Sequence, residues 1–487
     1  MRGARRHLVY GWVGLGLAGS LALTAADSQL LAGKPIHWWL TVHLGSREFC
    51  HHVFWAGLLA LCVAWLGLGL RPGRPVGRRL LLLAGGVWAV PLLLGPALFS
   101  GDMYSYLAQG DMLRLGINPY AHGPAALAGA HQAGVLKTVS PFWRHTPAPY
   151  GPLFVGLAAA IAAIASSHLV LAVLLLRVLE LGGLALLAVY VPRLARALGA
   201  DPDRAVWLVV ISPLVLVEAI GGGHNDALMA GLLIAGVTYA IERRPVVAIV
   251  LCALAAAIKL PALAAIVLIA ACWFRASDAR ARVLATTLAV TAGVFAVVGL
   301  VTTVGVSWIS SGTLSTPGRA HLAITPATAA GYTLHSLIGS GPSAHTLESV
   351  IVGAAVAGTA VLGLVLLRRV RYERLALYLG VLLLASVLGG PVSWPWYLIW
   401  GTALVAVDPR SQRWPLLPVA IVVASFVIRP NGILMLPIDE APYAFAVYAA
   451  VALAVVAVVV LRRRRDRQPV LRRDGVIRGP RAVEVLR

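Results

Sequence analysis

The first stretch of the sequence that can carry chemistry is Gly101-Asp-Met-Tyr-Ser-Tyr106, which directly follows a strongly apolar run. Asp102 would be a carboxylate held at the start of a helix, where it could take a proton from a hydroxyl group. Tyr104 and Tyr106 lie beside it in the sequence and are candidate substrate-binding residues. Asp is also a preferred N-cap residue, and on spacing alone this structural role is the favoured one.

A second polar cluster is Gly221-Gly-Gly-His-Asn-Asp226, again at the end of an apolar run. Three glycines allow a tight turn with close backbone approach. His224, Asn225 and Asp226 would gather donors and acceptors at one point, which favours polar substrate binding over a bare turn. Two ligand types on one turn fall short of a metal coordination set. We therefore predict no metal site and no cofactor, and the sequence leaves a divalent metal requirement open.

Two cations stand in similar places. Lys259 and Pro261 interrupt the apolar run 245–274, and a cation there suits the anionic head group of a lipid. The alternative is a lysine that merely extends its charged end to the membrane surface. Arg144 can bind a phosphate through two parallel hydrogen bonds. Its alternative is a positioning charge for a lipid head group.

Aromatic side chains accompany these charged groups at the edges of apolar runs. Tyr150, Trp394 and Tyr397 could stack on the face of a sugar and are candidate substrate-binding residues. They could equally belong to the belt of aromatic residues that membrane proteins place at the interface with water. The belt is the safer default.

The elements that position all these residues must be membrane helices. Of the 487 residues, 59% are apolar and 12% are charged, whereas a soluble domain carries roughly 25% charged residues. Apolar runs that approach the bilayer-crossing length of about 20 residues recur along the chain, which excludes a soluble enzyme. The predicted spans are 8–25, 52–70, 79–99, 169–192, 204–220, 226–241, 245–258, 260–274, 283–306, 347–367, 374–390, 393–407, 414–429 and 442–461, with 151–167 as a further candidate.

The fold class is therefore all-α, a polytopic integral membrane protein with about 13–15 transmembrane helices. The net charge is +21, but the arginines cluster between apolar runs, as the positive-inside rule expects of cytoplasmic loops. This placement argues against a nucleic acid partner and puts both termini in the cytoplasm. The four cysteines form no disulfide or metal-binding pattern.

The outer side of this topology carries two long loops, 100–150 and 307–346. In the first loop, Tyr104, Leu107, Asp111 and Leu115 recur at steps of three and four residues, which predicts an amphipathic helix on the membrane surface. We predict one transmembrane domain over 1–461 and a basic cytoplasmic tail over 462–487 that lies against anionic lipids.

One acid, several cations and many aromatic residues thus gather at the outer ends of helices. A transferase that uses a sugar activated by a lipid phosphate needs this assembly. One carboxylate takes the proton of the acceptor hydroxyl, and cations offset the charge that develops on the departing phosphate. A single base opposite the leaving group inverts the anomeric carbon, by analogy with hydrolases.

The sequence resembles the actinobacterial alpha-(1→6)-mannopyranosyltransferases of the GT-C glycosyltransferase superfamily. The stretches that carry the resemblance are Gly101-Asp-Met-Tyr-Ser-Tyr106, Gly116-Ile-Asn-Pro-Tyr120, Pro149-Tyr-Gly-Pro152, Gly223-His-Asn-Asp-Ala-Leu-Met229 and Lys259-Leu-Pro261, and the region Trp394–Trp400 is similar too. The resemblance implies a GT-C-like fold and a plasma-membrane mannosyltransferase whose active site faces outside the cytoplasm.

The same resemblance implies a polyprenyl-phosphate-mannose donor and a lipid-linked mannan acceptor, as in the synthesis of lipomannan and lipoarabinomannan for the cell envelope. It assigns the general base to Asp102 and the contact with the carrier phosphate to Lys259 and, less directly, Arg144. Two alternatives remain from the sequence. One is a transporter or flippase of a lipid-linked sugar, since broken spans also occur in transporters. The other is a GT-C enzyme for a different sugar.

Overall fold

The computed structural model describes residues 2–30, 38, 42–70, 76–130, 133–166, 168–309, 325–339, 341–430 and 440–467. These residues form helices and connecting turns without a β-strand, which confirms the all-α prediction. Six described helices are long and apolar enough to cross a membrane, and six shorter apolar helices accompany them. The chain is therefore a polytopic membrane protein, while the total of about 13–15 spans stays a prediction.

The helices have the following bounds: α1 Arg2–Leu30, α2 Arg47–Gly69, α3 Arg78–Leu94, α4 Asp102–Arg114, α5 Ala133–Thr138, α6 Pro152–Ala165, α7 Leu169–Ala197, α8 Pro202–Val209, α9 Asp226–Ile241, α10 Pro245–Ala256, α11 Leu263–Arg275, α12 Arg280–Val301, α14 Pro326–Ile338, α15 Ala344–Arg369, α16 Leu375–Gly389, α17 Leu398–Val405, α18 Leu416–Ser425 and α19 Ala441–Arg467. Short 3-10 turns are η1 Pro124–Ala130, η2 Pro141–Trp143, η4 Leu260–Ala262, η5 Ser307–Ile309, η6 Tyr372–Arg374, η7 Pro395–Tyr397 and η8 Ser411–Arg413, and η3 Val215–Gly221 is a π-helix.

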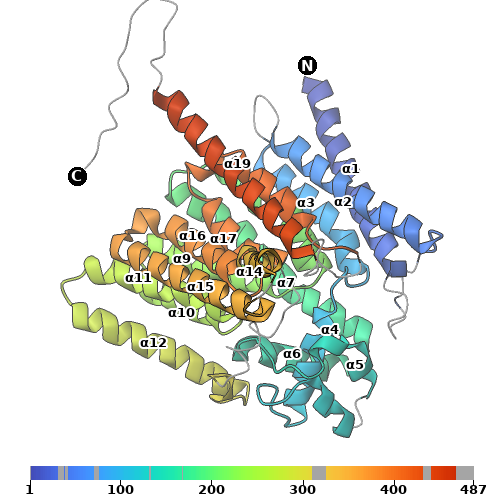
Figure 1. The fold of residues 1–487 in the computed structure, drawn as a ribbon, viewed down its shortest axis with the longest axis horizontal. Helices are drawn as coiled ribbons and strands as arrows, with labels where there is room; N and C mark the ends of the chain where they lie inside the picture. The colour runs from blue at the N-terminus through green and yellow to red at the C-terminus, as the bar shows by residue number, and fades with distance from the viewer. Residues whose placement is uncertain are drawn as a thin grey trace, which may run out of the picture.

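The arrangement in space groups the helices around α7 and α9 (Figure 1). Helices α1, α2 and α3 pack together, α9 packs between α7 and α10, and α16 packs against α17. The contact of α7 with α9 depends on glycine, because a Cβ atom at Gly183 would lie 2.3 Å from the backbone nitrogen of Leu228. Small residues allow two helix backbones to approach closely, as membrane helices commonly do.

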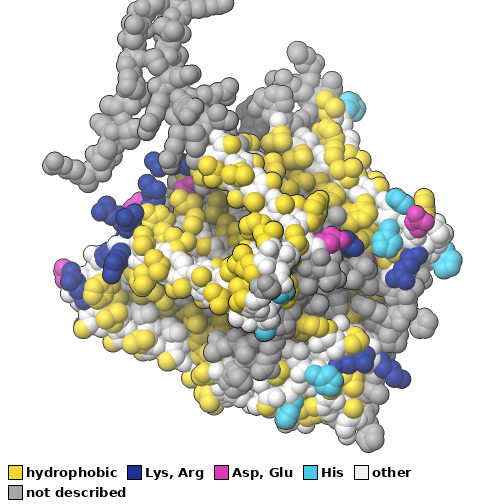
Figure 2. Space-filling model, in the orientation of Figure 1, with side chains coloured by type: hydrophobic (Ala, Val, Ile, Leu, Met, Phe, Trp, Pro, Cys, Tyr) yellow, Lys and Arg dark blue, Asp and Glu magenta, His cyan; other side chains and the backbone are white. Residues whose placement is uncertain are grey.

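The surface has the pattern expected of a membrane protein. Figure 2 shows hydrophobic side chains over the middle of the visible face, with arginine and lysine gathered toward its edges. Helices α12 and α15 expose large apolar residues along their length, among them Leu288, Leu300 and Val350. Contact of such side chains with water is unfavourable, whereas contact with the lipid tails of a bilayer is not.

The predicted break at Lys259 is confirmed. Helix α10 ends at Ala256, the turn η4 begins at Leu260, and α11 follows with 13 residues. The predicted span 204–220 is interrupted as well, because α8 ends at Val209 and the chain continues through Ser212 and Pro213 into the π-helix η3. Proline cannot donate the backbone hydrogen bond that a continuous helix needs, and π-helices frequently occur at functional sites.

The predicted helix after Asp102 exists as α4, but it does not lie on a surface. Every residue from Met103 to Met112 is buried, and α4 packs against α6. The spacing of apolar residues could not reveal this, because a helix shows the same pattern whether its apolar face meets lipid or protein. The candidate segment 151–167 forms α6, whose 14 residues are fewer than the roughly 20 that cross a bilayer.

In the second predicted loop, 310–324 lies outside the described residues, and α14 follows it. The helix α19 continues to Arg467, so the predicted start of the tail at 462 falls within a helix. The division into a transmembrane domain and a tail stays a prediction, and 468–487 lies outside the described residues.

Candidate functional site

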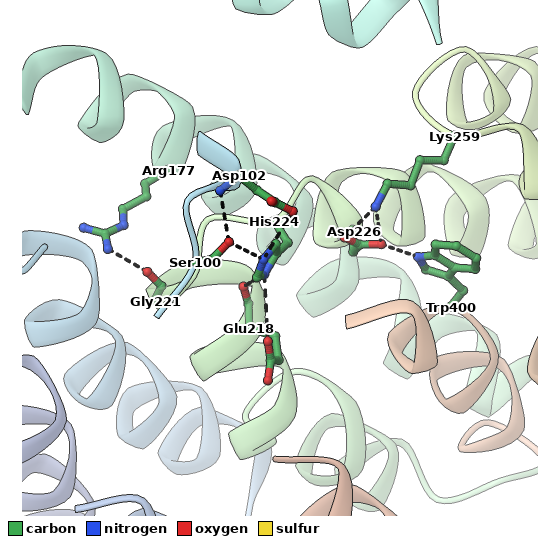
Figure 3. Close-up of polar contacts among 9 residues, drawn as sticks. All are labelled: Ser100, Asp102, Arg177, Glu218, Gly221, His224, Asp226, Lys259 and Trp400. Atoms are coloured by element: carbon green, nitrogen blue, oxygen red, sulfur yellow. Dashed lines mark hydrogen bonds and ion pairs between the residues drawn. The ribbon is translucent and has the colours of Figure 1, made fainter. Parts of the chain in front are cut away.

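Three breaks between helices meet at one place. The first is the turn Gly95–Gly101 between α3 and α4, the second is the turn Gly222–Asn225 between η3 and α9, and the third is the break at Lys259. Figure 3 shows Ser100 and Asp102 beside His224, and Lys259 and Trp400 of α17 beside Asp226. Residues far apart in the sequence thus form one candidate site.

His224 connects the first two turns. Its Nδ1 atom lies 2.7 Å from the backbone oxygen of Glu218, and its Nε2 atom lies 2.9 Å from Oγ of Ser100. Burial lowers the pKa of His224 to about 3, so the ring is neutral at pH 7. A carbonyl oxygen only accepts hydrogen bonds, so Nδ1 carries the ring proton and Nε2 accepts from the Ser100 hydroxyl. The face of the ring stacks on Trp396 with centroids 3.5 Å apart.

Asp102 is the first residue of α4, and the N-cap position belongs to Gly101. The backbone N–H of Asp102 donates to Ser100 Oγ at 3.1 Å. Its Oδ2 atom lies 3.8 Å from Nε2 of His224, and its side chain keeps 16% of its surface exposed. Asp102 is therefore not the N-cap residue, and its carboxylate can be reached from outside the protein.

Asp226 and Lys259 form a buried ion pair. Nζ of Lys259 donates to both carboxylate oxygens of Asp226 at 2.8 Å, and Nε1 of Trp400 donates to Oδ1 at 2.6 Å. The ammonium also lies over aromatic rings, 4.8 Å from the ring centre of Tyr397 and 5.8 Å from that of Tyr150. Lys259 is thus fixed inside the site and does not extend to the surface.

Tyr150 contacts both Tyr106 of α4 and the ammonium of Lys259. Its ring contacts that of Tyr106 edge to face, with centroids 5.0 Å apart. Burial raises the pKa of Tyr150 well above its usual range, and the negative charge of Asp102 raises it further. The Tyr150 ring therefore lies beside α4, the helix that begins at Asp102, as well as beside Lys259.

The other predicted site residues surround the contacts described above or lie apart from them. Trp394 stacks on Trp396, behind the ring of His224. Tyr104 is buried within α4. Asn225 is buried, and neither atom of its amide has a hydrogen-bond partner within the described part of the chain. Arg144 is half-buried and donates from Nε to the backbone oxygen of Val139 at 3.1 Å, which anchors it in the segment between α4 and α6.

The sequence analysis missed Arg177, which is fully buried in α7. Its guanidinium donates to the backbone oxygens of Leu93, Gly95, Pro96 and Gly221. Glu180, one turn further along α7, accepts from the backbone N–H of Leu228 in α9 at 3.2 Å. The signal that could have found both is an ionisable residue inside an apolar run, which is costly and commonly functional. Glu218, inside the predicted span 204–220, carried the same signal, whereas Ser100 and Trp400 did not.

The site combines a reachable carboxylate, a neutral histidine and a buried cation within one polar region. Such a group can accept a proton at Asp102 and balance negative charge at Lys259. Among the described residues, no group of three His, Cys, Asp or Glu side chains is arranged to hold a metal ion.

Comparison with known proteins matches both parts of the chain. The family model described as "Alpha-(1->6)-mannopyranosyltransferase, N-terminal domain" matches residues 9–275, and the "MptB C-terminal domain" matches residues 325–463. Alpha-(1→6)-mannopyranosyltransferase A of Mycobacterium tuberculosis is 33% identical over 423 residues, which cover 82% of this chain and 80% of the relative. The Corynebacterium glutamicum protein of the same name is 35% identical over 237 residues, 47% of each chain. No solved structure matches the chain.

Proposed function

The chain belongs to the alpha-(1→6)-mannopyranosyltransferase family and is a glycosyltransferase, and from this premise we propose its substrates and mechanism. The enzyme moves mannose from polyprenyl-phosphate mannose to a lipid-linked mannan acceptor and forms an alpha-(1→6) linkage. Asp102 is the general base, and the anomeric carbon is inverted. The relatives, all named as transferases, favour this function over the transporter alternative.

The observation that carries the mechanism is the position of Asp102. Its carboxylate is partly exposed and lies beside the neutral ring of His224. The Nε2 atom of that ring presents a lone pair, so the ring does not weaken the carboxylate as a base by donating a proton to it. Asp102 takes the proton of the acceptor hydroxyl as the oxygen bonds to the anomeric carbon and the sugar–phosphate bond breaks.

Lys259 supports the leaving group in this proposal. A lysine ammonium has three N–H donors, and the two oxygens of Asp226 take two of them. The third can donate to an oxygen of the departing phosphate, whose negative charge grows as the bond breaks. The rings of Tyr150 and Tyr397 hold the ammonium in place by cation–π attraction.

The location proposed for the reaction is the outer face of the plasma membrane. Asp226 begins α9, whereas Arg243 and Arg244 follow the other end of that helix. Arg78 and Arg79 likewise begin α3, and the turn that carries Ser100 follows its other end. If the arginines mark the cytoplasmic side, the site faces outward, where a lipid-linked acceptor can reach it.

The test is Asp102→Asn in the full-length protein, reconstituted in liposomes with labelled polyprenyl-phosphate mannose and a short alpha-(1→6)-mannan acceptor. We expect transfer to fall by about 10²–10⁴-fold, the usual contribution of a positioned base, while donor binding persists. Asp111→Asn is the matched control, because Asp111 lies on the same helix and pairs with Arg114. Transfer at the wild-type rate in Asp102→Asn would refute the base assignment. Movement of the label without a new glycosidic bond would favour a transporter.

The choice of sugar is tested with the same preparation. Polyprenyl-phosphate derivatives of another hexose and of a pentose are offered in place of the mannose donor. We expect transfer from the mannose donor alone. Transfer from another donor, with none from the mannose donor, would show that this chain uses a different sugar.

A further inference from the structure

The turn Gly95–Gly101, which delivers Asp102 to the site, has a strained backbone. Phe99 has a φ of 37°, in the left-handed region that a residue with a large side chain rarely adopts. The backbone N–H of Ser100 donates to the oxygen of Leu98 across Phe99, as in a γ-turn, and γ-turns with a positive φ are rare. Such a conformation persists only where the surroundings hold it.

Asp27 of α1 is the side chain that holds the strained residue. It is fully buried, and its Oδ1 atom accepts the backbone N–H of Phe99 at 3.2 Å. An aspartate inside a membrane helix is costly and is seldom kept without a function. Here it contacts the turn three residues before the helix that begins at Asp102.

The opposite side of the turn is held by α7. Arg177 donates to the backbone oxygens of Gly95 and Pro96, and to that of Gly221, which lies directly before the turn that carries His224. The N–H of Leu98 also donates to the oxygen of Gly221, at 3.1 Å. The turn is therefore fixed between two buried charged side chains from two different membrane helices.

We propose that Asp27 is a positioning residue for the general base Asp102. By holding the N–H of Phe99, it keeps the turn in the conformation in which Ser100 meets both His224 and the N–H of Asp102. Asp27 belongs to none of the sequence motifs of the site, and it acts on the site through the N–H of Phe99. The inference rests on the proposed role of Asp102 as the base.

The test compares Asp27→Ala with Asp27→Asn in the reconstituted transfer assay. Asparagine keeps an oxygen that accepts the N–H of Phe99, whereas alanine does not. Displacement of a catalytic group by about 1 Å can cost roughly 10²-fold in rate. We expect Asp27→Ala to lower kcat by about that factor with little change in KM, and Asp27→Asn to restore most of it. Ser20→Ala, another buried polar position of α1, is the control and should transfer normally.

A second measurement separates positioning from general damage. In an Asp102→Asn background the base is absent, so Asp27→Ala should not lower the residual rate further. If Asp27→Ala does not accumulate in membranes, Asp27→Leu, which fills the site but lacks the acceptor, takes its place. A wild-type kcat in the variant that lacks the acceptor overturns the proposal, as does a further loss in the Asp102→Asn background. Transfer that survives Asp102→Asn alone instead overturns the base assignment.

Discussion

Separating the two partners of the buried ion pair gives the most quantitative prediction. Lys259→Met removes the cation and leaves the carboxylate of Asp226 buried, and Asp226→Asn removes the anion but keeps an oxygen for Trp400. At the observed N–O distance of 2.8 Å and an effective dielectric constant of about 20, the attraction is about 6 kcal/mol. Desolvation offsets part of this, and breaking one side of a buried pair commonly costs about 3–5 kcal/mol.

The double variant Lys259→Met/Asp226→Asn leaves neither charge uncompensated. We expect each single variant to lower the free energy of unfolding by about 3–5 kcal/mol, and the double variant to regain most of that loss. Transfer should behave differently, because the double variant still lacks the cation that we propose for the departing phosphate. We therefore expect the free energy of unfolding, but not the rate of transfer, to recover in the double variant.

The assay pairs reversible unfolding in detergent with the reconstituted transfer reaction, so that both quantities are measured on one preparation. Lys137→Met is the matched control, since Lys137 is an exposed lysine at the end of α5. Single variants that cost less than about 1 kcal/mol would refute the reasoning about the pair, because that value is typical of an exposed one. Wild-type transfer by the double variant would refute the role of Lys259 toward the phosphate.

Two further predictions concern the residues that hold the site together. Arg177→Lys should lower both the thermal stability and the rate of transfer. The planar guanidinium of arginine donates to four backbone oxygens, whereas a lysine ammonium has only three N–H donors. A variant as stable as wild type would contradict this role of Arg177. Burial lowers the pKa of His224 to about 3, whereas a histidine in the unfolded chain has a pKa of about 6.5. As the pH falls below about 6.5, the unfolded state therefore binds a proton before the folded state does. The free energy of unfolding should fall by up to about 1.4 kcal/mol per pH unit until about pH 3. His224→Gln should show a shallower decline over this pH window in the same unfolding measurement, and an equal slope would contradict a buried neutral histidine.

Local patterns in the sequence were enough to predict the apolar helices and the break at Lys259, because each depends on neighbouring residues. The ends of helices that carry Asp102 and His224 could be identified for the same reason. The residues that contact these helix ends could not be predicted from the sequence. Ser100 and His224 are 124 residues apart, and Trp400 and Asp226 are 174 residues apart. Such pairs depend on which helices pack together, and the spacing of apolar residues along one helix does not determine its neighbours.

The placement of α4 failed for a related reason. Its apolar residues recur with helical spacing, and the prediction assumed that lipid would cover them. In the structure α6, η1 and α5 pack against this helix instead. In a chain that is mostly apolar, periodicity identifies a helix but does not distinguish a face that meets lipid from one that meets protein.

Helix α7 explains how a site assembled from distant turns can keep fixed dimensions. Arg177 binds the turn that leads to Asp102, and Glu180, three residues later and on the same face of the helix, binds the start of α9 next to Asp226. A rigid helix therefore sets the distance between Asp102 and the ion pair. At Gly183 the backbone of α9 also packs closely against α7. Because buried ionisable side chains inside a membrane are costly, we infer that Arg177 and Glu180 lie on one turn of α7 to fix this spacing. A substitution at Gly183 should accordingly disturb transfer even though its backbone contacts α9 rather than any substrate.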